Sequence, residues 1–120
     1  ALVYSRVIPD GAGSIAEARG VAIDLAGTAW VAGTTSGLAL AQVAPSQPGY
    51  GGGATDAFVV RLDPVGAGTL FSTYAGGIGA DRGNALALHA DGSVYLAGST
   101  NSANFPVARG GADYDAFVLK

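Results

Sequence analysis

The chain contains no cysteine and no methionine, and only 12% of its 120 residues are charged. Without cysteine it can form no disulfide, thiolate metal site or cysteine nucleophile. The few Lys and Arg residues are scattered and the net charge is −3, which argues against nucleic-acid binding because that needs a clustered basic surface. No apolar run approaches the roughly 20 residues that span a bilayer, so we expect no membrane insertion. Without methionine, we expect a processed product or part of a longer gene product.

Glycine and apolar residues are abundant. The sequence has 20 glycines, 49% hydrophobic residues and a mean hydropathy of +0.36, which is too apolar for a disordered chain. Glycine supplies the positive φ angles of tight turns. This composition indicates sheets that pack on both faces and turn often.

The sequence contains an internal repeat. Asp-Ala-Phe-Val at residues 56–59 returns at residues 115–118, and segment 27–34 returns with conservative changes as 92–99. A long repeat built from short β-rich segments indicates one supersecondary unit stacked on copies of itself. We therefore expect a single repeat region over 1–120, with repeat one at about 1–68 and repeat two at about 69–120.

Each copy resolves into four short strands separated by turn signals. In the second copy, Asp91-Gly92 between two apolar runs predicts a tight hairpin. Segment 57–62 carries apolar side chains on both faces, so it predicts a strand between two layers. The predicted strands are 19–25, 28–35, 56–63 and 69–74 in the first copy, and 84–89, 93–99 and 115–120 in the second, with 2–7 as the counterpart of 69–74.

Four-stranded sheets covered on both faces and repeated are typical of β-propeller blades. The sequence thus predicts an all-β fold of two four-stranded antiparallel β-propeller blades per chain. Because strand 2–7 precedes the first set of four, and strand 115–120 would be an uncovered edge, we expect the blades to be completed by strand exchange between chains.

Segments 70–77, 83–88, 92–100, 104–106 and 115–118, in this order, resemble the bacterial SBBP β-propeller repeat over essentially the whole chain. The first copy departs from the pattern, with residues 6–10 replacing a Thr-Tyr-x-Gly-Gly run and Ala44-Pro45 standing where Phe105-Pro106 stands. The resemblance implies a propeller in a secreted or cell-surface bacterial protein, and it brings no shared catalytic residues.

Aromatic and amide side chains in the two long loops, 36–55 and 100–114, are the candidate ligand-binding residues. Loops on a rigid scaffold are where binding residues collect, and aromatic rings can stack on a sugar or a peptide. The candidates are Tyr50, Asn104, Phe105 and Tyr114.

Signals for catalysis and cofactors are weak. The G-x-G-x-x-A run at 11–16 has the dinucleotide spacing, but no helix-length segment follows, so we interpret it as a turn. His89 stands alone without a second base. Asp81 and Asp113 are the calcium-ligand candidates, yet no D-x-[DN]-x-[DN]-G spacing occurs. We predict no enzyme activity, no catalytic residue, no metal and no cofactor.

Two pairs of aromatic residues recur at matching strand positions, Trp30 with Tyr95 and Phe58 with Phe117, which predicts core packing between blades. The residues predicted to carry assembly lie in the first and last strands: Leu2, Val3, Tyr4, Ser5, Phe117, Val118 and Leu119.

These observations favour a non-catalytic structural and interaction module of an extracellular bacterial protein, which assembles head to tail with copies of itself into a propeller ring or a filament. The alternative is a carbohydrate-binding, lectin-like propeller that uses its long loops. A fragment of a propeller enzyme ranks last. The expected partners are copies of the chain and a glycan or surface protein.

Overall fold

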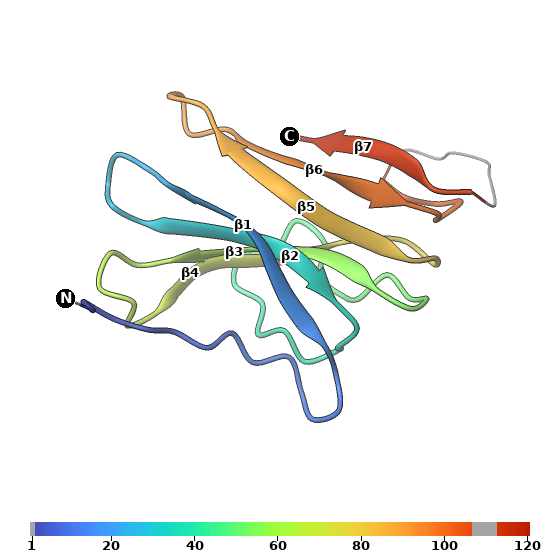
Figure 1. The fold of residues 1–120 in the computed structure, drawn as a ribbon, viewed down its shortest axis with the longest axis horizontal. Helices are drawn as coiled ribbons and strands as arrows, with labels where there is room; N and C mark the ends of the chain where they lie inside the picture. The colour runs from blue at the N-terminus through green and yellow to red at the C-terminus, as the bar shows by residue number, and fades with distance from the viewer. Residues whose placement is uncertain (1, 107–112) are drawn as a thin grey trace.

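The computed structural model describes residues 2–106 and 113–120, which form two antiparallel sheets and no helix (Figure 1). The first sheet has four strands in chain order: β1 (Ala16–Ile23), β2 (Ala29–Thr35), β3 (Asp56–Leu62) and β4 (Thr69–Ala75). The second has three: β5 (Asp81–Leu88), β6 (Val94–Thr100) and β7 (Asp115–Leu119). The prediction of an all-β, antiparallel fold is confirmed.

A β-bulge recurs at the same place in both sheets and explains an error at the first strand of each copy. The register of β1 with β2 shifts between Ala18 and Gly20, and that of β5 with β6 shifts between Gly83 and Ala85. A bulge switches which side chains face inward, so the alternation breaks there. Strands predicted to begin at residues 19 and 84 in fact begin three residues earlier, before the bulge.

The two sheets pack face to face, with β5 lying across β1, β2 and β3. On the first sheet the inward side chains include Trp30, Ala32 and Val59, and on the second they include Leu96 and Phe117. The sheets therefore share one apolar layer, which lies between them.

In this layer the two sheets contact each other through faces that are not equivalent in the sequence repeat. Phe117 occupies the sequence position that Phe58 has in the first copy, yet Phe58 points to the opposite face of its own sheet, into a separate cluster. Conversely, Val59 faces the second sheet and is 6% exposed, while its counterpart Val118 lies on the uncovered face and is 70% exposed. The sheets are related as successive copies in a stack and are not mirror partners.

The long loop after β2 covers the far face and the outer edge of the first sheet. Leu40 and Tyr50 pack on the cluster around Phe58. At the edge, the Ser72 N–H of β4 donates to the Val43 carbonyl at 3.0 Å, which forms an isolated bridge. No such cover is found along β7 among the described residues.

The segment 2–7, predicted as a strand, is not one in this single chain. It pairs with no strand in the described part of the chain, and it runs past the turn between β3 and β4, where Arg6 Nη1 donates to the Ala67 carbonyl at 3.1 Å (Figure 1). Leu2, Val3 and Val7 are 82%, 88% and 81% exposed. A strand needs a neighbour to satisfy its backbone groups, and the isolated chain offers none here.

Candidate interaction site

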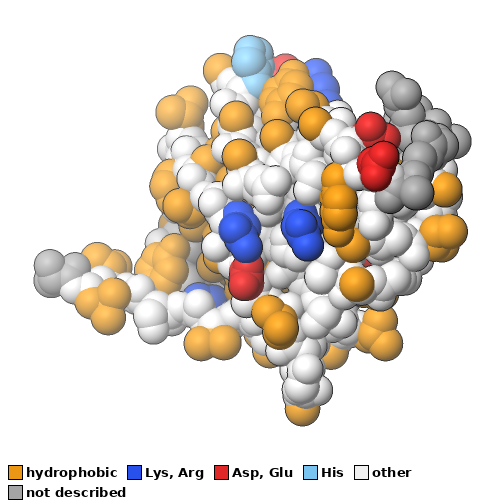
Figure 2. Space-filling view, turned by 45° about the vertical axis from the view of Figure 1, so that its right-hand side comes forward, with side chains coloured by type: hydrophobic (Ala, Val, Ile, Leu, Met, Phe, Trp, Pro, Cys, Tyr) orange, Lys and Arg blue, Asp and Glu red, His pale blue; other side chains and the backbone are white. Residues whose placement is uncertain are grey.

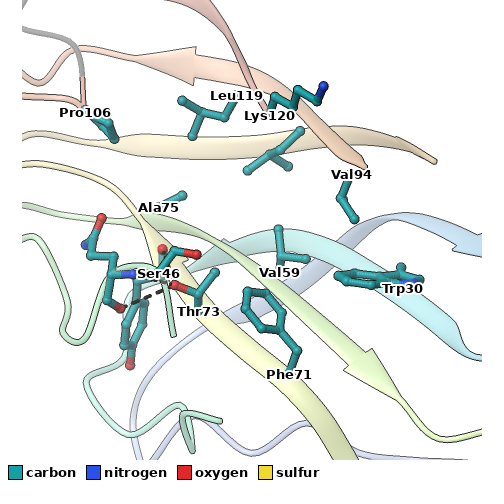
Figure 3. Close-up of a pocket in the computed structure, with 13 residues that line it drawn as sticks. Trp30, Ser46, Val59, Phe71, Thr73, Ala75, Val94, Pro106, Leu119 and Lys120 are labelled. Carbon is teal, nitrogen blue, oxygen red and sulfur yellow. Dashed lines mark hydrogen bonds between the residues drawn. The ribbon is translucent and has the colours of Figure 1, made fainter. Parts of the chain in front are cut away.

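A groove of about 390 Å³ lies between the two sheets (Figure 3). Its floor and one wall come from β2, β3 and β4 of the first sheet, and the other wall comes from β6, β7 and the residue that follows β7. The lining residues that matter for its chemistry are Trp30, Val59, Phe71, Thr73, Leu119 and Lys120.

The groove exists because the sheets have unequal numbers of strands. β4 of the first sheet extends its inward face, with Phe71 and Thr73, beyond the edge of the second sheet. Phe71 packs its ring against Trp30 at a centroid distance of 5.8 Å and is only partly covered. A fourth strand beside β7 would lie over these side chains. The groove therefore occupies the place that a fourth strand of the second sheet would fill.

The rim of the groove is polar. Gln47 donates its backbone N–H to Thr73 Oγ1 at 2.9 Å, which fixes the loop to β4 at one end of the groove (Figure 3). At the other side, the Lys120 ammonium lies 5.6 Å from the centre of the Tyr95 ring. An apolar floor with an exposed strand edge suits a peptide in extended conformation, because main-chain hydrogen bonds give affinity and the floor takes alternate side chains.

The four loop residues predicted to bind a ligand are not gathered in one site. Phe105 is buried against Phe117, with ring centroids 4.3 Å apart, so its ring offers no surface for stacking. Asn104 uses its Oδ1 to accept the Ile78 N–H at 2.8 Å. Both side chains therefore hold their loop against the rest of the fold.

Tyr50 and Tyr114 lie in different settings. Tyr50 packs edge-on against Tyr74 on the far face of the first sheet, and burial raises the pKa of its hydroxyl. Tyr114 is nearly half exposed, with the Arg82 guanidinium 5.1 Å from its ring centre. Of the four candidates, Tyr114 alone keeps an open ring, and the neighbouring residues 107–112 lie outside the described part.

Three aspartates are buried where loops meet the ends of the strands. Asp81 accepts the Gly77 N–H and the Ser102 hydroxyl, both at 2.7 Å, and Asp10 accepts the Thr35 hydroxyl. Asp56 accepts the Gly51 N–H at 2.6 Å, and burial raises the pKa of this carboxyl to about 6. These carboxyls fasten loops to strands, and nothing in the local sequence separates Asp56 from its exposed counterpart Asp115.

The calcium candidates Asp81 and Asp113 also differ in setting, because Asp81 is fully buried and Asp113 is exposed. Within residues 2–106 and 113–120, no group of three or more His, Asp or Glu side chains is placed to hold a metal ion. His89 sits on the hairpin between β5 and β6, with Nδ1 3.0 Å from the Asp91 carboxylate. No helix in this part of the chain has the length and hydropathy to cross a membrane.

No curated protein matches the chain. A repeat family matches part of it. Residues 70–106 match the SBBP family, described as a beta-propeller repeat, and the match runs from β4 of the first sheet through β5 and β6 of the second. The repeat unit thus begins with the outermost strand of one sheet and continues into the next. The resemblance noted in the sequence is confirmed over this segment, residues 70–106.

Proposed function

We propose that the chain is a non-catalytic structural and interaction module of an extracellular bacterial protein, and that its sheets are propeller blades that stack head to tail with further copies. The observation that carries this proposal is the meeting of unlike faces between the two sheets. In such a stack each end presents the surface that the other end can bind.

The uncovered face of the second sheet repeats the covered face of the first. Tyr95, Ala97 and Val118 occupy the positions of Trp30, Ala32 and Val59, which are packed against the second sheet. A surface with this pattern fits the face of another blade. Contiguous apolar surfaces on soluble proteins commonly mark interaction sites.

Two blades do not close a ring, since propellers have roughly four to eight. The contact between copies is heterologous, so the product is a ring if the rotation closes and a filament if it does not. The match of residues 70–106, which spans two sheets, supports blades that interlock through a shared strand. In this proposal the three-stranded blade receives its fourth strand from a neighbouring copy.

The carbohydrate-binding alternative has narrower support. It depends on Tyr114, since Phe105 and Asn104 are engaged within the fold. A glycan array with the Tyr114→Ala variant as control tests it, and a specific signal lost in that variant would favour the lectin reading.

Sedimentation velocity on the purified chain tests the stacking proposal. We expect a mass that is a multiple of the 11.7 kDa chain. Val118→Asp places a charge on the uncovered face and should return the protein to a single chain, whereas Val65→Asp, in the exposed turn after β3, should not. A wild-type protein that stays at the mass of one chain at all concentrations would refute the proposal.

A further inference from the structure

We propose that the groove along β7 binds residues 2–7 of a second copy as the missing fourth strand of the second sheet. This inference rests on the proposed function and specifies the register, the side chains and the partner of the contact. The occupant is a second copy because the chain itself contains an apolar segment that pairs with no strand among its described residues and leaves Leu2, Val3 and Val7 exposed.

The groove along β7 and segment 2–7 match each other, because both present apolar side chains and, in the part of the chain that the structure describes, unpaired backbone. The groove has an apolar floor with Val59 and Phe71, and β7 offers an unpaired strand edge on one side among the described residues. The segment carries Leu2, Val3 and Val7, each more than four-fifths exposed. In Figure 2 the segment projects from the body of the molecule, with its hydrophobic side chains uncovered.

The segment already lies where the fourth strand of a preceding blade would lie. It crosses the far face of the first sheet, where Val7 and Ile8 line a small cavity with Leu40 and Val60. β4 is related to the second sheet in a similar way, because it precedes β5 in the chain and its Phe71 and Thr73 line the groove beside β7. A preceding copy could therefore add its β7 to this segment without a rearrangement of the first sheet.

The repeat fixes the register of the contact. In the complete sheet, β3 places Val59 opposite Thr73 and Val60 opposite Ser72. Val118 and Leu119 are the counterparts of the two valines.

On the partner side, Arg6 and Ser5 stand in the places of Thr73 and Ser72. The predicted pairs are Arg6 with Val118 and Ser5 with Leu119. Side chains then alternate, so Val3, Ser5 and Val7 enter the groove while Tyr4 and Arg6 face outward.

Disulfide trapping tests this register directly, because the chain has no native cysteine. Residues directly opposite in an antiparallel pair have Cα atoms about 4.5–5.5 Å apart, within disulfide range, whereas diagonal neighbours are about 7–8 Å apart. The Arg6→Cys/Val118→Cys variant should give a covalent ladder of chains on a non-reducing gel, and the ladder should collapse on reduction. The matched variant Arg6→Cys/Ala116→Cys, displaced by two residues on the same face, should remain mostly single chains.

A second pair of variants tests the groove without cysteine. Val3→Asp/Val7→Asp adds two charges to the inserted side chains and should reduce the sedimenting species to a single chain. Leu25→Asp/Val65→Asp adds the same charges at two exposed turns and should leave the assembly intact.

The outcomes separate the two proposals. An assembled protein with no ladder from the first cysteine pair would overturn the strand placement and leave the stacking proposal standing. Equal ladders from both cysteine pairs would overturn it too, because they indicate unspecific contact. A protein that remains a single chain in every form overturns both.

Discussion

The two sheets share sequence and local geometry but differ in burial. Both carry the same bulge. Both also place a cation at the end of the third strand, or directly after it, over an aromatic ring of the second strand: Arg61 over Trp30 at 5.1 Å and Lys120 over Tyr95 at 5.6 Å. Yet Asp56 is fully buried and Asp115 is exposed. Local sequence therefore sets the conformation of each strand, while the neighbours of a sheet decide which of its side chains are buried.

The hairpin between β1 and β2 and the hairpin between β5 and β6 differ in their side-chain hydrogen bonds. In the first sheet, Asp24 accepts hydrogen bonds from Thr28, from Trp30 Nε1 at 3.2 Å and from Arg61 at 2.9 Å. In the second sheet His89 takes the place of Asp24 and contacts Asp91 only at an exposed turn. The first sheet is thus held by a local network and by a covering loop, and neither is found at the second sheet among residues 2–106 and 113–120.

The largest expected difference between the copies concerns their matched phenylalanines. Phe58 is buried in the cluster of the covered face, so Phe58→Ala should lower the free energy of unfolding by about 3–5 kcal/mol. Phe117 is partly exposed beside the groove, so Phe117→Ala should cost clearly less in dilute, unassembled protein. Urea unfolding followed by tryptophan fluorescence gives both values. Equal losses would show that the burial of the two copies does not differ in solution.

The same two variants, Phe58→Ala and Phe117→Ala, can also be compared at protein concentrations at which the chain assembles. If β7 receives a strand, Phe117 becomes more buried and the gap between the two losses should narrow as protein concentration rises. A gap that is independent of concentration would contradict strand addition.

Strand positions and pairing were predictable from the sequence because they depend on local patterns. The tight turn at Asp91-Gly92 and the apolar side chains on both faces of 57–62 led to the right elements, and β2, β3, β4 and β7 lie within a residue or so of the prediction. The error at β1 and β5 has one cause, since a bulge reverses the alternation from which a strand is recognised.

The candidate site was less predictable. Phe105 was assigned to ligand binding because it lies in a loop, but the loop folds back and buries the ring against Phe117, a contact across the sheet that no local pattern encodes. Within the described residues no strand lies beside β7, and the groove at this place is revealed only by the arrangement of both sheets. Asp56 and Asp115 sit in the same four-residue motif, so their different burial is a property of the tertiary structure alone.

A smaller difference separates the two aspartates. The pKa of Asp56 is about 6 in the folded protein against an ordinary 3.8, so the folded state holds this proton more tightly than the unfolded state. Its contribution to stability is present at low pH and is lost as the pH rises through about 6. Relative to Asp56→Asn, which cannot titrate, the wild type should lose up to about 3 kcal/mol between pH 4 and 7.

Asp115→Asn is the matched control for this measurement. Its carboxylate is exposed, so this variant should have nearly the same free energy of unfolding as the wild type at pH 7. Using the difference between variants cancels the other carboxyls, such as Asp63, whose pKa is lowered by backbone N–H groups and whose contribution has the opposite sign. Parallel curves for the wild type and Asp56→Asn would show that Asp56 is hydrated in the folded protein.

The smallest expected effect comes from the hairpins. Asp24→Asn removes the charge that Thr28, Trp30 and Arg61 share, so it should lower the urea midpoint at pH 7, whereas His89→Asn should leave it unchanged because His89 is exposed. These hydrogen bonds, chiefly from Thr28, hold the pKa of Asp24 well below its usual range. The contribution of Asp24 is therefore present at neutral pH and is lost as the pH falls, so the two midpoints for wild type and Asp24→Asn should converge in acid. If His89→Asn proved as costly as Asp24→Asn, the two hairpins would be equally supported, and the difference between the copies would lie only in the covering loop and the missing strand.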